Sequence, residues 1–257
     1  MQMTFSRLVL PELLDGLEAQ DPVAQRSRRD LQRVHRVMGT RNILLRALRA
    51  LPIRQSQTPL RILELGAGDG SLMLGVARAL QGEWPEVKLT LLDRQHLLNA
   101  STIAEYARVG WAATAQVGDV FDWAAGQHTA APPAHAPPHW DLIVVNLFLH
   151  HFQTPQLSTL LAVIAARTEH FVACEPRRAW LAWAGSHLIG LLGVNAVTRE
   201  DAVLSVRAGF CGAELETLWP TMAAGRSLAE YPAGLFSHCF VAANNPGQLV
   251  GTSIKAE

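Results

Sequence analysis

Three glycines at alternate positions, accompanied by two carboxylates, mark the stretch of this chain best suited to holding a ligand. They are Gly66, Gly68 and Gly70 of the segment LELGAGDG, with Glu64 and Asp69 beside them. Glycine has no Cβ and adopts positive φ without strain, so a ligand can lie directly against the backbone. The carboxylates would repel a pyrophosphate but match a positively charged ligand. We therefore expect a cationic small molecule at this turn.

The elements that position the turn are predicted from hydrophobic periodicity. The run LRILEL (residues 60–65) predicts a strand, and SLMLGVARAL (71–80) has helical spacing. Further strands are predicted at residues 87–93, 111–119, 141–149 and 170–175, and further helices at 97–110, 155–169 and, capped by Thr198, 199–210. Strands at 213–220 and 234–243, with no helix between them, predict an antiparallel pair at one edge. This alternation predicts a doubly wound α/β sheet, in which ligands bind at the carboxyl ends of the strands.

The segment LELGAGDG resembles the first motif of class I S-adenosylmethionine-dependent methyltransferases of the bacterial small-molecule type. The resemblance covers residues 58–243, where GDVFD (118–122) and DLIVVNLFLHHF (141–152) follow in the family's order. It implies a Rossmann-like, seven-stranded, mostly parallel sheet with an antiparallel C-terminal pair. It also implies S-adenosyl-L-methionine as cofactor and S-adenosyl-L-homocysteine as product. The implied cofactor-binding residues are Glu64, Gly66, Ala67, Gly68, Asp93, Arg94, Asp119, Val120 and Asn146.

Some of these positions have roles within the family. Asp93, at the end of the second strand, would hold the ribose hydroxyls, and Asp119 would contact the adenine amine. Residues 141–152 resemble the fourth-strand motif beneath the methionine moiety. Each acid also has an ordinary structural alternative: Asp93 and Asp119 suit turns, and Glu64 suits a helix cap or a loop acceptor.

Methyl transfer from a sulfonium is an in-line displacement with a neutral leaving group, so catalysis rests largely on positioning and on excluding water. A phenolic acceptor has a pKa of about 10, which makes a base useful near neutral pH. His151 is the preferred candidate base, with His150 beside it and His187 as a rival. In the structural alternative, one histidine of the pair bonds the loop backbone and His187 is satisfied within a helix.

We divide the chain into an N-terminal helical cap (residues 1–57) and a methyltransferase core (58–245). Within the core, residues 176–199 form a lid or acceptor-pocket insertion, unless their apolar side chains are simply buried. The stretch EPRR (175–178), together with NAVTREDAVLSVRAGF (195–210), resembles bacterial methyltransferases that accompany polyketide-type pathways. This resemblance favours O-methylation of a lipophilic or phenolic small molecule in secondary metabolism.

Other features of the two regions leave alternatives open. Residues 26–51 predict two helices broken near Gly39, from which His35 or Arg41 would meet the methionine carboxylate or remain on the surface. Glu175 would pair with a following arginine at the pocket floor or in a loop. Residues 126–139 predict a surface loop, whose histidines we do not expect to bind metal.

Composition narrows the function further. Among the 257 residues, Lys+Arg and Asp+Glu each number 22, so no basic excess favours a nucleic-acid partner. Cys174 and Cys239 lie in apolar runs and predict buried thiols. No signal peptide or membrane span is expected, which favours the cytoplasm. Oligomeric state is left open. The alternative functions are an NAD(P)-dependent oxidoreductase, disfavoured because Ser71 replaces its third glycine, and a non-catalytic S-adenosylmethionine-binding module.

Overall fold

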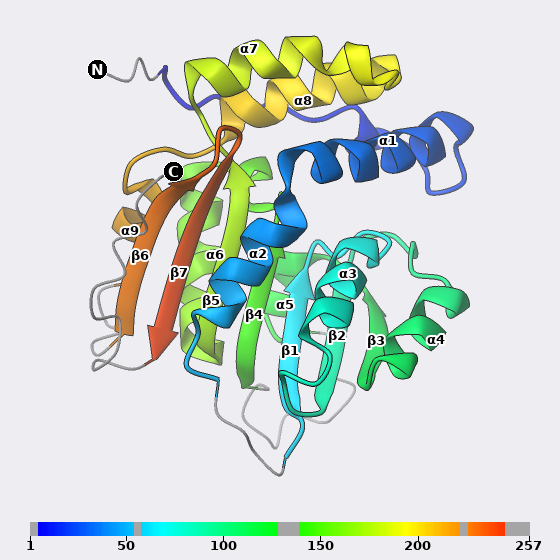
Figure 1. Cartoon of the computed structure of the whole chain (residues 1–257). Helices are drawn as coiled ribbons and strands as arrows, with labels where there is room; N and C mark the ends of the chain where they lie inside the picture. Colours follow the sequence, from blue (N-terminus) through cyan, green and yellow to red (C-terminus); the bar gives the residue numbers. More distant parts are fainter. Residues whose placement is uncertain (1–4, 54–57, 128–138, 221–225, 245–257) are drawn as a thin grey trace.

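A computed structural model of the chain describes residues 5–53, 58–127, 139–220 and 226–244. Its centre is a seven-stranded sheet in the order β3-β2-β1-β4-β5-β7-β6 (Figure 1). The strands are β1 Leu60–Leu65, β2 Val87–Asp93, β3 Trp111–Val117, β4 Trp140–Asn146, β5 Thr168–Pro176, β6 Arg226–Ala233 and β7 Ser237–Asn244. β1 to β5 pair in parallel, whereas β7 is antiparallel to both of its neighbours. The predicted doubly wound sheet with an antiparallel C-terminal pair is confirmed.

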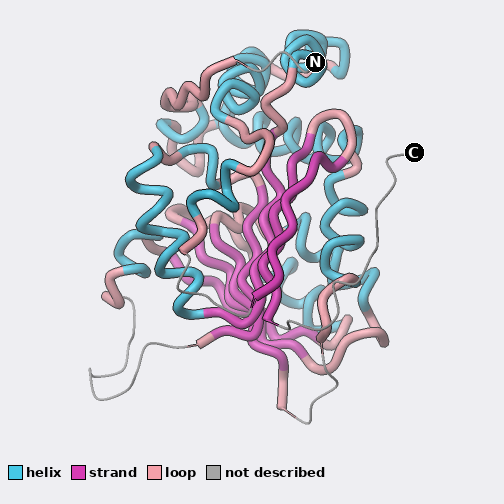
Figure 2. The backbone as a smooth tube through the Cα atoms, turned by 90° about the vertical axis from the view of Figure 1, so that its left-hand side faces the viewer, coloured by secondary structure: helices cyan, strands magenta, loops and turns pink. Residues whose placement is uncertain are grey.

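Helices cover both faces of the sheet (Figure 2). The longer ones are α1 Pro22–Met38, α2 Thr40–Arg49, α3 Ser71–Leu80, α4 Ala100–Arg108, α6 Thr154–Arg167, α7 Trp180–Leu188 and α8 Ala196–Ala208. Short helices are η1 Leu14–Gly16, α5 Val120–Ala124, η2 Leu149–His151, η3 Ile189–Leu192 and α9 Glu214–Leu218. Apolar residues of α2 and α3 form the core on one face, and those of α5, α6 and α9 form it on the other. Because both faces are covered, β5 is buried along nearly its whole length.

A separate layer lies over the carboxyl ends of the parallel strands. It consists of α1, α7 and α8, drawn at the top of Figure 1. The N-terminal strap, by which we mean residues 5–17, runs along α8. The backbone N–H of Leu8 donates to Arg207 O at 3.0 Å, and the N–H groups of Leu13 and Leu14 donate to the Asp201 carboxylate at 2.7 and 3.0 Å. The strap is thereby tied to α8, close to the strand ends where a ligand is expected.

The two predicted N-terminal helices are confirmed, and they occupy different places. They meet at Gly39, which has φ +68° and ends α1 in the left-handed conformation. α1 lies in the layer over the strand ends, whereas α2 packs on the sheet face beside α3. The division into a cap at 1–57 and a core at 58–245 stays a prediction.

The predicted strand at 213–220 is wrong. Residues Glu214–Leu218 form α9, in which Leu215 and the following Trp219 are buried four residues apart, at helical spacing. The antiparallel pair instead joins β6 to β7. β6 is an edge strand of mostly half-buried residues, and it contains Pro232, which an edge position tolerates.

Two predicted boundaries are also corrected. The helix expected at 199–210 begins earlier, at Ala196, and its cap is Asn195, whose side chain accepts the backbone N–H of Thr198 at 2.9 Å. The strand expected at 141–149 ends at Asn146, because Leu147 takes φ +50° and turns the chain into η2. Residues 128–138 of the predicted surface loop lie outside the described residues.

The two buried thiols predicted from the sequence are confirmed. Cys174 and Cys239 are free and buried, and they lie opposite each other in the register of β5 and β7. None of the helices in the described ranges combines the length and the apolar character that crossing a membrane requires. The segment 176–199 is not simply buried, because Leu181, Leu188 and Leu191 on α7 and η3 are exposed.

Candidate active site

The glycine turn lies where the strand order reverses, between β1 and β4, and its three glycines serve different purposes. All three have positive φ, between +57° and +71°. A Cβ on Gly66 would lie 2.5 Å from the ring of Phe148, and one on Gly70 would lie 2.8 Å from Leu98. A Cβ on Gly68 would meet nothing within 4 Å. The Phe148 ring therefore requires glycine at 66, and the Leu98 methyl group at 70 could move aside, whereas Gly68 borders open space that a ligand can enter.

Three carboxylates gather around this open position. Glu64 is only 3% exposed, and within the described residues its Oε2 has no hydrogen-bond partner. Burial raises the pKa of Glu64 well above its usual value, and the nearby carboxylates of Asp93 and Asp69 raise it further. A buried acid without a partner among other acids is a costly arrangement that a cationic ligand relieves. The site thus fits the positively charged ligand expected from the sequence.

Asp93 braces the turn itself. Its Oδ2 accepts the backbone N–H of Gly68 at 2.8 Å, and its Oδ1 accepts that of Gln95 at 2.9 Å. Asp119 has a comparable local role as the N-cap of α5, where it accepts the N–H of Phe121 at 2.7 Å. The structural alternatives considered for both acids are therefore present, and their contacts with ribose and adenine stay predictions.

Helix α1 lies against the turn. The Gln32 amide donates to Asp69 Oδ2 at 2.7 Å and to the Ser71 hydroxyl at 3.3 Å. One turn further along the helix, His35 has a buried Nε2 without a hydrogen-bond partner in the described part of the chain. Burial lowers the pKa of His35 to about 4, against the opposing effect of Asp69, so this imidazole is neutral. Of the two expected carboxylate partners, His35 lies near the turn, whereas Arg41 packs against Gly75 of α3.

A second cluster forms at the turn after β4, and buried Glu175 organises it. One oxygen of this carboxylate accepts the backbone N–H groups of Phe148 and Leu149, at 3.0 and 2.9 Å. The other accepts Nδ1–H of His150 at 2.8 Å. The prediction that Glu175 pairs with an arginine is therefore wrong, because the N–H groups of η2 and the His150 ring occupy it. This network holds the strained turn at Leu147 in place.

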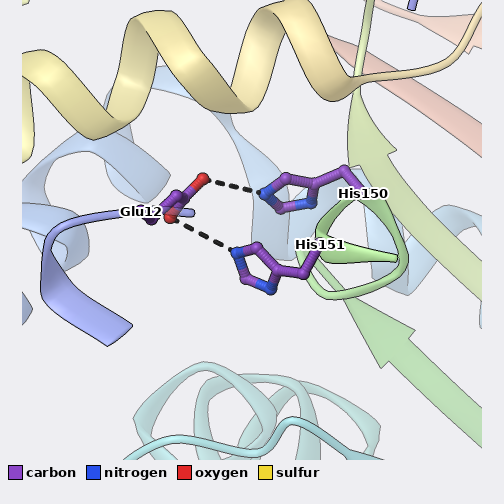
Figure 3. A group of neighbouring side chains, drawn as sticks. All are labelled: Glu12, His150 and His151. Atoms are coloured by element: carbon purple, nitrogen blue, oxygen red, sulfur yellow. Dashed lines mark hydrogen bonds and ion pairs between the residues drawn. The ribbon is translucent and has the colours of Figure 1, made fainter. Parts of the chain in front are cut away.

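The histidine pair meets Glu12 of the strap (Figure 3). Nε2 of His150 lies 3.2 Å from Glu12 Oε1, and Nε2 of His151 lies 3.3 Å from Oε2 of the same carboxylate. Burial opposes charge on His150, but Glu12 and Glu175 outweigh it and raise its pKa to about 9. The two histidines lower the pKa of Glu12 well below its usual value. His150 is buried, whereas the side chain of His151 is 22% exposed.

The two clusters adjoin through Phe148. Its ring packs over Gly66 on one side and edge-on to His151 on the other, with a ring separation of 6.2 Å. Asn146, at the end of β4, is buried and its Oδ1 has no partner among the described residues. A cofactor on the glycine turn would therefore lie beside the histidine pair.

The remaining predicted site residues are placed differently. Ala67 is half-buried in the turn, and Val120 is buried at the start of α5. Arg94 donates to the Asp15 carbonyl of the strap at 2.9 Å. His187 is exposed on α7, where its ring packs edge-on against Trp183. No described contact joins His187 to the histidine pair.

Glu12 and Gln32 are site residues that sequence reasoning missed. Glu12 stands 138 residues before His150, and no local pattern connects the two. Gln32 lies within an ordinary amphipathic helix, and only the packing of α1 brings it to the turn. For Glu175 the residue was identified, but not its partner.

Comparisons with family models and with curated proteins give no match. Solved structures do match. The chain is similar to the plantazolicin methyltransferase BpumL in complex with SAH, with 15% identity, a TM-score of 0.58, and 88% of this chain and 92% of that one covered. It is similar to an O-methyltransferase family protein from Burkholderia thailandensis, with 11% identity, a TM-score of 0.56, and coverage of 90% and 62%.

A third similar structure is an O-methyltransferase family 2 protein from Planctomyces limnophilus in complex with apigenin, with 16% identity, a TM-score of 0.54, and coverage of 88% and 62%. The chain therefore spans less than two thirds of the length of the Burkholderia and Planctomyces proteins. Together these similarities show that the chain has the class I S-adenosylmethionine-dependent methyltransferase fold.

Proposed function

We propose that this protein is an S-adenosylmethionine-dependent methyltransferase that acts on a small molecule. The observation that carries the proposal is that open space at Gly68 adjoins the buried acid Glu64, which has no hydrogen-bond partner among the described residues, at the switch point of the sheet. A dinucleotide would bring a pyrophosphate to this turn, next to Glu64, Asp69 and Asp93, and the charges would repel each other. A sulfonium nucleoside with an ammonium group suits the same acids. The similarity to SAH-bound BpumL supports this assignment.

The chain's own residues would divide the work of holding the cofactor. Glu64 and the glycine turn would face its cationic amino-acid part. Asn146 and His35 would supply polar atoms that have no partner within the described ranges. Asp93 would accept from the ribose hydroxyls, and Asp119 would lie at the adenine end beside Val120. The bound cofactor supplies an electrophilic methyl group. The protein's contribution is to align the acceptor with it and to exclude water.

We favour oxygen as the methylated atom, in a phenolic or otherwise lipophilic acceptor. The histidine pair lies beside the glycine turn, and His151 is its more exposed member. A hydroxyl bound there would give its proton to the His151–Glu12 pair as the oxygen attacks. His150 is less suited to this role, because both of its ring nitrogens already face carboxylates. The apigenin complex of the Planctomyces protein supports a phenolic acceptor.

Thermal unfolding with S-adenosylhomocysteine and with NAD tests the cofactor. We expect S-adenosylhomocysteine to raise the melting temperature and NAD to leave it unchanged, because only a ligand that binds the folded state stabilises it. If NAD raises the melting temperature and S-adenosylhomocysteine does not, the protein is better explained as an NAD-dependent oxidoreductase.

Incubation with labelled S-adenosylmethionine and a panel of phenols then tests the chemistry. We expect label in an organic product, and a lower rate in His151→Ala at unchanged cofactor affinity. Cofactor binding without transfer to any phenol, amine or carbon acid tried would favour the binding module.

A further inference from the structure

We propose that Glu12, His150 and His151 form a binding site for a divalent transition-metal ion, with Zn²⁺ as the best-matched ion. The three side chains come from the N-terminal strap and from η2, and their ligand atoms all lie within 4.8 Å of one another. Figure 3 shows both imidazole Nε2 atoms directed at the two oxygens of one carboxylate. This set, two histidines and one glutamate, is a common ligand set for catalytic zinc.

The spacing of the donor atoms suits such an ion. Tetrahedral coordination with bonds of 2.0–2.1 Å places neighbouring donors about 3.3 Å apart. The distances from the Glu12 oxygens to Nε2 of His150 and to Nε2 of His151 are 3.2 and 3.3 Å. Both histidines present the same ring nitrogen, and their rings lie 4.2 Å apart at an angle of 44°. All three ligand atoms lie within 4.8 Å of one another, a spacing that one bound ion can bridge.

The surroundings of the cluster supply the outer contacts that metal-binding histidines usually have. Glu175 accepts Nδ1–H of His150, so Nε2 is the nitrogen that would bind a metal, and the ion would displace the proton that Nε2 carries when this imidazole is charged. The Ser205 hydroxyl donates to Glu12 Oε1 and so fixes the direction of the carboxylate. Asp15 Oδ2 lies 3.9 Å from Nε2 of His151, at the edge of the cluster.

The charges around the cluster favour a cation. Glu12, Glu175 and Asp15 are the acids that contact the two histidines. Arg7 is the opposing cation, and its guanidinium donates to the backbone carbonyls of His150 and Phe152 rather than to the ligand atoms. Nitrogen and carboxylate donors together select zinc and its transition-metal neighbours over magnesium or calcium, which prefer oxygen alone.

Metal binding at this site does not depend on the proposed methyl transfer, but a bound ion would change how the acceptor hydroxyl is activated. Phe148 separates the cluster from the glycine turn by one aromatic ring. An acceptor hydroxyl bound to the ion would lose its proton to solvent more readily, because the cation stabilises the resulting oxyanion. The histidines would then act as ligands, and the ion would take over the activation assigned above to His151.

The test is a zinc titration of the full chain after chelator treatment, in competition with a chromophoric zinc chelator. We expect one ion per chain, and an affinity at least about tenfold lower in Glu12→Gln and in His151→Ala, since each loses one ligand. Glu175→Gln removes no ligand, but it weakens an outer contact of His150 and the turn that carries both histidines, so it should also lower the affinity by about tenfold or more. His187→Ala is the matched control, because that exposed histidine is not part of the cluster.

Cobalt substitution gives a second readout that needs no catalysis. Co²⁺ bound by two nitrogens and a carboxylate in a tetrahedral site should give intense visible absorption, which Glu12→Gln should abolish. The proposal is overturned if wild type, Glu12→Gln and His151→Ala bind zinc with equal affinity. It is also overturned if His187→Ala loses the zinc affinity of the wild type. The increase in melting temperature caused by S-adenosylhomocysteine is measured on the same chelator-treated samples. It tests cofactor binding alone, so a protein that binds the cofactor but no zinc contradicts the metal site and not the proposed function.

Discussion

The carboxylate of Glu175 and the imidazole of His150 are joined by a buried hydrogen bond of 2.8 Å that links the end of β5 to the turn after β4. The same carboxylate accepts backbone N–H groups of η2, so it fixes both the turn and the tautomer of the histidine. The position of the candidate active-site histidines therefore depends on a residue in a different strand.

Glu175→Gln should destabilise the protein and lower the pKa of His150. The amide keeps an oxygen for the backbone donors but loses the charge that balances His150, and breaking one side of a buried pair costs about 3–5 kcal/mol. Urea unfolding and an NMR titration of His150, both with chelator present, measure the two effects. The matched control is Glu230→Gln, which alters the buried Glu230–His238 pair of 2.7 Å. It should lower stability while leaving the pKa of His150 unchanged; an equal pKa in both variants would contradict the role given to Glu175.

The glycines of the turn should respond differently to alanine. Gly66→Ala should prevent stable folding, because the added methyl group meets the Phe148 ring and the backbone has φ +71°. Gly68→Ala should fold with a loss of about 1–2 kcal/mol from its positive φ, and should bind S-adenosylhomocysteine far more weakly. Gly110→Ala, also at positive φ with open space around it, should lose similar stability without loss of affinity. Calorimetric binding would contradict this assignment if the Gly68 and Gly110 variants bound equally well.

Cofactor binding should release a proton from Glu64. The pKa of Glu64 is higher in the folded protein than in the unfolded chain, where it is 4.5. Without ligand, the free energy of unfolding therefore falls as pH rises from 4.5 through the pKa of the folded state, because only the folded state keeps the proton. A bound cation favours the carboxylate, so affinity for S-adenosylmethionine should increase with pH over that same window. Calorimetry in buffers of different ionisation enthalpy measures the released proton. Glu64→Gln should show neither proton release nor that pH dependence; release of the same size in the variant would exclude Glu64 as its source.

Asp93→Ala should weaken S-adenosylhomocysteine binding by about 1–3 kcal/mol, as expected for hydrogen bonds to a charged group. Because Asp93 also accepts the N–H groups of Gly68 and Gln95, the variant should lose stability as well. Asp93→Asn separates the two effects, since one amide oxygen remains to accept from the turn while the charge is gone. Affinity equal to wild type in both variants would remove Asp93 from the site and leave it as a brace of the turn.

The parts of the fold that could be predicted are those specified by local sequence. In the strands at 60–65 and 87–93 most of the apolar residues are buried, so both appear as mainly apolar stretches, and the helix at 71–80 has a clear apolar face. The glycine turn was located for the same reason. β6 was not, because an edge strand alternates weakly and contains Pro232, whereas the short apolar pattern at 213–220 suits a helix as well as a strand.

The cofactor half of the candidate site could be proposed from the sequence, because Glu64 and Asp93 lie at the carboxyl ends of the neighbouring strands β1 and β2, and Gly68 follows β1. The histidine half of the candidate site could be predicted only in part. His150 and His151 follow β4 directly, but Glu12 reaches them from the strap, which is held by α8 near the other end of the chain. The sequence predicts no metal site, since nothing local relates an acid near the N-terminus to histidines 138 residues later.

The contact of Gly66 with Phe148 means that substitutions at these two positions should be correlated in evolution. No side chain fits at 66 while the ring occupies its place, and a smaller residue at 148 would leave a void over the turn. Relatives that carry alanine or serine at the first position should therefore carry a reduced side chain at the second, and the two changes should appear together along a lineage. Covariation of positions 66 and 148 would show that the steric fit between the glycine turn and the turn after β4 is maintained by selection.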